Sequence, residues 1–219
     1  MSRAQDVFVD GRTVRAVNGG RALVLVGHLG HIQVTSGRLG ACDPIVGARD
    51  AWPFARSVAP GHYAVDVAVL EFPNAERRVA LARVQLAERE PVWWESAAPE
   101  GAQPGDLKPG EAYGYCVDGG IGCFADVRAL RAFDEWGEHA TNELARELEE
   151  TYEPAWAWAD IRCGAAGENV IVFSSGIGDG FYFSYWGFAD DGTIVSLVTD
   201  FGLCELDWVT APAGAQPSA

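Results

Sequence analysis

The sequence lacks the patterns that would assign it to a membrane, secreted or nucleotide-binding class. It has no apolar run near the roughly 18 residues that a membrane-spanning helix needs. Its first residues, Met1 to Asp6, have no apolar stretch of the kind found in signal peptides. No GxGxxG fingerprint and no P-loop occurs, so no cofactor motif supports redox chemistry. We therefore expect a cytoplasmic protein with no membrane partner.

Cysteine is scarce and scattered. The five cysteines form an odd, widely spread set: Cys42, Cys116, Cys123, Cys163 and Cys204. In the cytosol all of them can stay reduced, whereas a secreted protein would leave one unpaired. Cys116 and Cys123 are the only close pair and no CxxC spacing exists, which disfavours a structural zinc site.

Basic residues are also few. The chain has 31 acidic and 16 basic residues, which gives a formal net charge of −15. Such a charge repels nucleic acid and anionic membranes, and it favours cations or basic protein surfaces as partners. Solubility alone is an equally good explanation, so the partner class stays open. The oligomeric state cannot be inferred from the sequence.

The apolar content is ample for a folded core. Apolar residues make up 48% of the 219 residues and aromatic residues 11%. A chain of this size buries roughly 70% of its extended surface without needing disulfides or metals. We expect a single domain over residues 1–211, with a Gly- and Pro-rich surface loop at 99–111 and a disordered tail at 212–219.

Most predicted elements are strands. Residues 22–26 and 31–35 read as two strands, and residues 62–70 and 78–86 read as a long antiparallel hairpin with one exposed face. Further strands are expected in the C-terminal third, at 169–173, 181–188, 193–201 and 204–209. One principal helix is expected at about 127–150, capped by Asp126 and weakened by Gly137. The predicted fold class is α+β, dominated by β structure, with a mainly antiparallel sheet or sandwich.

The first candidate for chemistry is the segment from Asp118 to Asp126. Three glycines in four residues, Gly119, Gly120 and Gly122, allow a close backbone approach to a ligand. The loop would hold two carboxylates above exposed backbone N–H groups and would end at a helix N-terminus. The alternative is a tight strand-to-helix connection in which Asp126 is an ordinary cap.

The second candidate is the segment from Ser174 to Gly187. It combines Ser175, Asp179, Tyr182 and Tyr185 with three loop glycines, which suggests a polar loop with aromatic walls. The segment is not the GxSxG elbow of hydrolases, and the four histidines suggest no triad. The alternative is a plain β-hairpin turn at Asp179–Gly180.

Other polar residues are scattered along the chain. Arg78 and Glu95 are candidate substrate-binding residues together with Ser175 and Tyr185, and Asp118, Asp179 and Tyr182 are candidate catalytic residues. If Asp43, Asp118, Asp126 and Asp179 converge, they would make a hard-oxygen site for Mg²⁺ or Ca²⁺, or an acid/base carboxylate pair. No cofactor is certain from these residues.

Several of these segments resemble one known family. The resemblance is found in the stretches from His28 to Pro44 and from Val117 to Asp126, and in the stretch from Ser174 to Gly187 followed by Leu197 to Phe201. Shorter matches are Pro60–Tyr63, Arg78–Ala80 and Trp94–Glu95. Together they resemble the uncharacterised bacterial domain-of-unknown-function family 4241 over about residues 28–203. Two positions depart from the family pattern, with Ile177 where an aromatic residue is expected and Gly120 where a small or polar residue is more usual.

The resemblance implies one cytoplasmic domain and groups the two Gly-Asp loops with Asp43 and Asp200, but it implies no activity. Two function hypotheses follow from the residues. The first is a small-molecule enzyme of hydrolase, lyase or cyclase type that uses a carboxylate-lined site between the two loops. The second is an acidic immunity-type or regulatory protein that covers a basic protein partner with the acidic helix face of Glu138, Glu143, Glu147 and Glu150.

Overall fold

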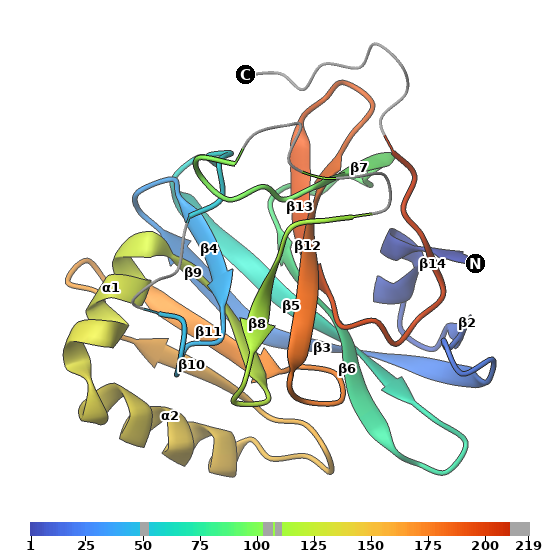
Figure 1. The fold of residues 1–219 in the computed structure, drawn as a ribbon, viewed down its shortest axis with the longest axis horizontal. Coiled ribbons are helices and arrows are strands. Elements are labelled where there is room, and N and C mark those ends of the chain that lie inside the picture. The colour runs from blue at the N-terminus through green and yellow to red at the C-terminus, as the bar shows by residue number, and fades with distance from the viewer. Residues whose placement is uncertain (49–52, 103–106, 108–110, 211–219) are drawn as a thin grey trace.

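The fold is known from a computed structural model that describes residues 1–48, 53–102, 107 and 111–210. The predicted tail at 212–219 lies outside these residues, as does most of the predicted loop at 99–111. The β-dominated α+β class predicted from the sequence is confirmed. Strands make two main antiparallel sheets, with two helices on the outer face of one of them (Figure 1).

The larger sheet has eight strands. In spatial order they are β2 (Thr13–Arg15), β3 (Arg21–Val34), β5 (Gly61–Glu71), β6 (Arg77–Gln85), β13 (Ile194–Asp200), β12 (Gly180–Phe188) and β7 (Trp93–Ser96), while β8 (Gly114–Val117) also pairs with β12. The two strands predicted at 22–26 and 31–35 are one long strand, β3, with an irregularity between His28 and Gly30. The β5–β6 hairpin is antiparallel as predicted.

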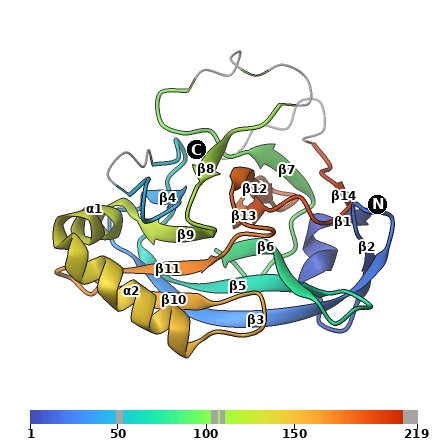
Figure 2. The same ribbon diagram turned by 60° about the horizontal axis from the view of Figure 1, so that its bottom comes forward.

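The smaller sheet has four strands and carries the helices. Its order is β10 (Trp158–Arg162), β11 (Asn169–Ser174), β9 (Ile121–Asp126) and β4 (Leu39–Cys42). Helices α1 (Val127–Trp136) and α2 (Glu138–Glu150) cover its outer face (Figure 2). The single helix predicted at about 127–150 is interrupted at Gly137, whose φ of +54° and ψ of −125° end α1 and begin α2. Such a conformation is open to glycine and strained for other residues.

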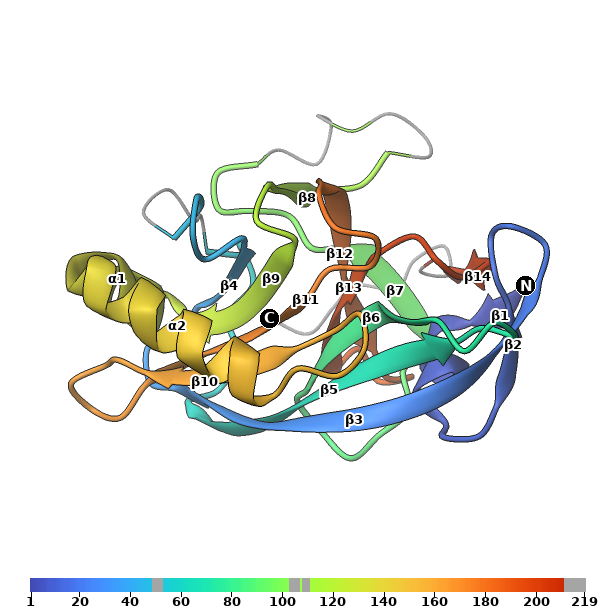
Figure 3. The ribbon, with the colours of Figure 1, turned by 90° about the horizontal axis from the view of Figure 1, so that it is seen from below.

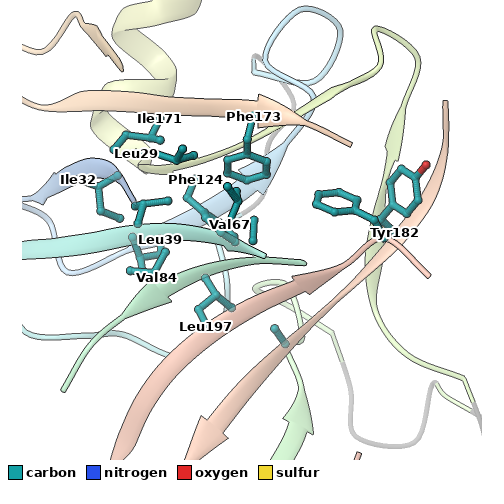
Figure 4. Close-up of a cluster of buried hydrophobic side chains, with 14 of the residues drawn as sticks. Leu29, Ile32, Leu39, Val67, Val84, Phe124, Ile171, Phe173, Tyr182 and Leu197 are labelled. Atoms are coloured by element: carbon teal, nitrogen blue, oxygen red, sulfur yellow. The ribbon is translucent and has the colours of Figure 1, made fainter. Parts of the chain in front are cut away.

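The inner faces of the two sheets meet in the main core. Figure 4 shows Phe124 and Phe173 of the smaller sheet opposite Val67, Val84 and Leu197 of the larger one. A second cluster lies between the four-stranded sheet and the helices and contains Leu130, Phe133 and Leu144. Each cluster follows from the alternation of apolar side chains along the strands and from the helical spacing in α1 and α2.

The outer face of the β5–β6 hairpin is buried, and the prediction of an exposed face is wrong. The hairpin has alternating apolar and small residues, and its second face holds Ala68, Leu70 and Ala80. A third core cluster covers them with side chains from the N-terminal 3-10 helix η1 (Ala4–Phe8) and from Leu203 and Cys204 near the C-terminus. Strands β1 (Ser2–Arg3) and β14 (Leu206–Asp207) pair in parallel at this end of the molecule, opposite the helices (Figure 3).

Within the described ranges, neither α1 nor α2 nor any other helix is long and apolar enough to cross a membrane.

Candidate functional site

The two Gly-Asp loops lie side by side at one edge of the sheets. Strand β8 pairs with β12 so that Val117 is opposite Gly180. The next residues outward, Asp118 and Asp179, therefore leave neighbouring strands at the same end of the ladder, and both are exposed. The loops are also joined directly, because the backbone N–H of Ser175 donates to the carbonyl oxygen of Gly120 at 3.0 Å. The sequence-based grouping of these two loops is supported by this geometry.

Asp43 holds the first loop from below. Its side chain is fully buried, and one carboxylate oxygen accepts from the backbone N–H groups of Asp118 at 3.0 Å and Gly119 at 2.7 Å. The other oxygen accepts from the N–H of Ile45 at 2.9 Å. A Cβ at Gly119 would lie 3.1 Å from the Asp43 carboxylate, which explains the need for glycine there. These two loop amides are therefore occupied and do not point toward a substrate.

Asp126 has a structural role of the same kind. It is fully buried and accepts from the backbone N–H groups of Thr35 at 2.8 Å and Ser36 at 2.7 Å, as well as from the Ser36 hydroxyl. It also caps α1 by accepting from the N–H of Arg128 at 2.8 Å. A carboxylate that is saturated by four donors has no lone pairs directed at a metal. The capping role predicted for Asp126 is confirmed.

The four aspartates do not form a metal site in the described part of the chain. Among those residues, no group of three or more His, Cys, Asp or Glu side chains is placed to hold a metal ion. The carboxylates of Asp43 and Asp126 accept hydrogen bonds from backbone N–H groups. Asp118 and Asp179 lie at the exposed ends of the loops. Strand register therefore places Asp118 and Asp179 at the same end of neighbouring strands, and the hydrogen bonds of the two buried aspartates leave these out as ligands.

The second loop is held by its own side chains. The Ser175 hydroxyl donates to the carbonyl oxygen of Gly178 at 3.0 Å, and the Tyr182 hydroxyl donates to the same oxygen at 2.7 Å. Gly176 and Gly178 have φ values of +53° and +114°, which glycine tolerates best. Burial and then the nearby Asp179 charge raise the pKa of Tyr182. Ser175 and Tyr182 thus shape the loop rather than present free hydroxyls.

An exposed apolar surface adjoins the loops. Ile177 at the tip of the second loop is 73% exposed, and Phe181 and Phe183 on β12 are 52% and 38% exposed. The two phenyl rings meet edge to face with centroids 5.5 Å apart. On the neighbouring strand β8 their partners are the small residues Cys116 and Gly114, which leave the rings uncovered. We call Asp118, Ile177, Asp179, Phe181 and Phe183 the loop face.

Phe181 and Phe183 are not among the functional residues predicted from the sequence. The signal was present, because β12 reads Phe181-Tyr182-Phe183-Ser184-Tyr185-Trp186. Residues alternate between the two faces of a strand, so a run of consecutive aromatic residues must direct every second ring outward. Tyr182 and Trp186 point into the core, while Phe181 and Phe183 point to solvent.

Tyr185 and Asp200 form a separate cluster with Trp208. The Tyr185 ring stacks on the Trp208 ring with centroids 4.0 Å apart and an interplanar angle of 19°. Burial, followed by the Asp200 charge, raises the pKa of Tyr185 to about 12. Burial likewise raises the pKa of Asp200 to about 6, opposed by the N–H of Gly202 and by Trp208. Trp208 was not among the residues predicted from the sequence.

Arg78 and Glu95, the other predicted substrate-binding residues, lie in two different pockets. Arg78 pairs with Glu76 at 2.7 Å and lines a pocket of about 400 Å³ that also contacts Ile177. The two carboxylate oxygens of Glu95 accept from one terminal nitrogen of Arg56, at 2.8 and 2.9 Å, and Glu95 lines a pocket of about 490 Å³. Only Arg78 therefore borders the loop face.

Fold and site together describe a β-dominated α+β protein with two interlocked Gly-Asp loops beside an exposed aromatic strand. Residues 32–199 match the model of a family described as "Protein of unknown function (DUF4241)". The chain belongs to this family, and the resemblance seen in the sequence is confirmed. No curated protein and no solved structure matches the chain.

Proposed function

We propose that the protein is a binding module that captures a basic protein partner through the loop face. The observation that carries this proposal is the exposure of Phe181 and Phe183 on β12, the strand that follows the second loop, together with the exposure of Asp118, Ile177 and Asp179 in the two loops. Contiguous exposed apolar side chains with a polar rim are typical of interaction sites. Aromatic residues are enriched at the energetic centres of protein interfaces.

The chemistry of the partner follows from charge. The chain carries a net charge of −15, and two acidic side chains stand at the rim of the loop face. A basic protein would be attracted at long range and oriented at short range, and its association would weaken with salt. The anchoring of the loops supports the same role, because Asp43 and Tyr182 hold them by partly buried hydrogen bonds. A pre-ordered surface loses little conformational freedom on binding.

The helix face that the sequence suggested for this role is less suited to it. Arg146 contacts both Glu143 and Glu150 at 2.6 Å, so a single cation balances much of the negative charge on α2. Glu147 accepts from the backbone N–H of Asp160 at 2.8 Å. Three acids of α2, Glu143, Glu147 and Glu150, therefore have partners within this chain, so the loop face is the better candidate.

The enzyme hypothesis keeps one supporting observation, which is the register that sets Asp118 beside Asp179. A carboxylate pair could exchange protons with a substrate in hydrolysis, elimination or cyclisation. The loop amides expected to stabilise negative charge are bonded to Asp43, and Tyr182 is bonded to Gly178. Binding is therefore the function that the geometry supports better.

The test is partner capture with matched surface variants. The immobilised protein is exposed to a lysate of cells that carry it, and the retained proteins are measured by quantitative mass spectrometry. We expect wild type to enrich one or a few basic proteins, and Phe181→Ser to lower their recovery roughly tenfold or more. Asp118→Asn combined with Asp179→Asn should reduce capture mainly at low salt, because their contribution is electrostatic.

Tyr152→Ala is the control, since Tyr152 is an exposed aromatic residue just after α2 and is not part of the loop face. Its profile should match that of wild type. If the basic proteins stay bound to Phe181→Ser but are lost from a Glu143→Gln and Glu150→Gln variant, the helix face is the interface and the proposal is wrong. The enzyme hypothesis would gain instead if a small molecule stabilised wild type but not Asp179→Asn.

A further inference from the structure

A pocket of about 280 Å³ lies at the opposite end of the molecule from the loop face, on the outer face of the eight-stranded sheet. Its floor is formed by residues of β6 and β13, and η1 and the chain before β7 form its sides. Strand register fixes the floor, because Ser196 is opposite Gln85 and Val198 is opposite Arg83. Ser196, Gln85 and Arg83 therefore all project from the same side of the sheet.

Two polar atoms on this floor are buried without a partner. Ser196 is only 3% exposed, and its hydroxyl oxygen has no hydrogen-bond partner in the described part of the chain. The Nε of Arg83 is also buried and has no hydrogen-bond partner among the described residues. A buried polar group left unpaired costs about 1–3 kcal/mol, and such groups are rare in native proteins. Both residues line this pocket, and a hydrogen-bonding molecule that reached these two atoms would remove that cost.

The rest of the Arg83 guanidinium is fixed. One of its terminal nitrogens donates to Asp66 at 2.7 Å, and Asp66 also contacts His28 at 3.0 Å. The guanidinium carbon lies 4.2 Å from the centre of the Phe8 ring, which stacks on it from η1. Arg83 is thus held in one orientation with Nε still free. An ordered guanidinium beside a hydroxyl is a suitable receptor for a carboxylate.

The rim of the pocket has the opposite charge. Glu88 and Glu90 line it and are exposed, while Arg89 between them is occupied by Asp190 and Asp191, at 2.6 Å each. The pocket therefore has hydrogen-bond donors at its floor and two exposed carboxylates at its mouth. A simple anion would be repelled by the rim, and a simple cation would leave the floor unsatisfied.

We infer that this pocket binds a small zwitterion of the free amino acid type. Its carboxylate accepts from Ser196 and from the Nε of Arg83, and its ammonium group lies toward Glu88 and Glu90. Phe8 and Trp94 supply apolar contact for the intervening carbon atoms. The volume is at the small end of the range for ligand pockets, roughly 300–1,000 Å³, which suits a molecule of this size. This site goes beyond the proposed function and shares no residue with the loop face.

The test is a thermal-shift screen of the full chain against the common L-amino acids, one at a time, at millimolar concentration. We expect one or a few of them to raise the Tm by roughly 5–10 °C near saturation. For each amino acid that does so, the amine lacking the carboxylate and the N-acetylated form should both give a much smaller shift. Calorimetric titration of the best ligand then gives its Kd.

Ser196→Ala is the discriminating variant. Because the hydroxyl has no partner in the free protein, its removal should leave the Tm without ligand unchanged or slightly higher. The Kd should nevertheless rise about five- to tenfold, since one hydrogen bond to a charged group is lost. Glu88→Gln combined with Glu90→Gln should weaken binding through the ammonium group.

Ser184→Ala is the matched control, because its hydroxyl is buried but already bonded to Thr199 at 2.9 Å. It should lower the Tm without ligand and leave the Kd as in wild type. The inference is overturned if no amino acid stabilises wild type, if Ser196→Ala binds as tightly as wild type, or if Ser196→Ala lowers the Tm as much as Ser184→Ala does.

Discussion

One carboxylate, that of Asp126, ties together three parts of the chain at the residue scale. It caps α1 through the N–H of Arg128 and fixes the turn between β3 and β4 through Thr35 and Ser36. Its charge is buried, and backbone donors compensate for the loss of water. Asp126 joins the smaller sheet to the helix layer, so loss of its carboxylate would destabilise both.

We therefore predict that Asp126→Ala destabilises the protein by about 3 kcal/mol or more, because four donors lose their acceptor at once. Asp118→Ala, at an exposed position eight residues earlier in the chain, should change the free energy of unfolding by less than about 0.5 kcal/mol. Urea unfolding of both variants measures this contrast. Equal losses would contradict the structural role assigned to Asp126.

Asp200 gives a prediction that depends on pH. Its pKa is raised from 3.8 to about 6 by burial, so the folded state binds a proton more tightly than the unfolded state does. Its favourable contribution is complete below about pH 4 and is lost as the pH rises through 6. Asp200→Asn removes this loss, because it is neutral at every pH.

The variant should therefore gain stability relative to wild type between pH 4 and pH 7, by about 2 kcal/mol at most. Urea unfolding of both proteins at several pH values measures the difference, in which the contributions of the other carboxylates cancel. A difference that stays constant across this pH range would show that Asp200 ionises normally in the folded protein.

Residue roles were harder to predict from the sequence than residue positions. The Gly-Asp loops were correctly expected to lie together, and Asp126 was recognised as a cap. Asp43 could not be recognised as the acceptor of Asp118 and Gly119, because 75 residues separate it from the first of these partners. A carboxylate that binds a metal and one that binds backbone amides look the same in a sequence.

At the scale of elements, Gly137 decides how the helical layer is built. It has φ of +54° and ψ of −125°, and among the described residues no atom outside its own chain neighbours and helix backbone lies within 4 Å of the position where a Cβ would be. A Gly137→Ala substitution therefore introduces backbone strain without a steric clash. The conformation belongs to a region that residues with a Cβ rarely occupy.

We predict that Gly137→Ala lowers the free energy of unfolding by about 1–2 kcal/mol, with no change in helix content. Chemical denaturation measures the first quantity and far-UV circular dichroism the second. If α1 and α2 instead fuse into one helix, the helix signal will rise and the stability will be maintained, which would contradict the break as an intrinsic feature of the fold.

The secondary structure was largely predictable, and its failures have local causes. Periodicity located the β5–β6 hairpin and the helical segment, since each has a clear apolar pattern. The covering of the hairpin's outer face was missed because the residues that cover it come from both ends of the chain, such as Val7 and Leu203. Periodicity within one segment carries no information about such distant partners.

At the scale of the whole molecule, the charge of −15 acts on stability as well as on partners. Repulsion among like charges opposes the compact state and is screened by salt. We predict that raising sodium chloride from low to physiological concentration raises the Tm by a few degrees, on the order of 1 kcal/mol. Calorimetry or a thermal-shift assay measures it.

A variant with Glu135→Gln and Glu149→Gln, both exposed on the helices, should show a smaller salt effect. If the Tm of wild type falls with salt, attraction within surface ion pairs such as Arg146 with Glu150 outweighs the overall repulsion.

The position of β13 has a consequence for how the chain is made. This strand lies in the middle of the eight-stranded sheet, between β6 and β12, although it is formed by residues 194–200 near the end of the sequence. In a growing chain on the ribosome, one edge of β6 would therefore stay unpaired while the residues between β6 and β13, about half of the chain, are synthesised. Unpaired edges of this kind invite pairing with other chains. We therefore expect the chain to be most prone to aggregation between the emergence of β6 and that of β13.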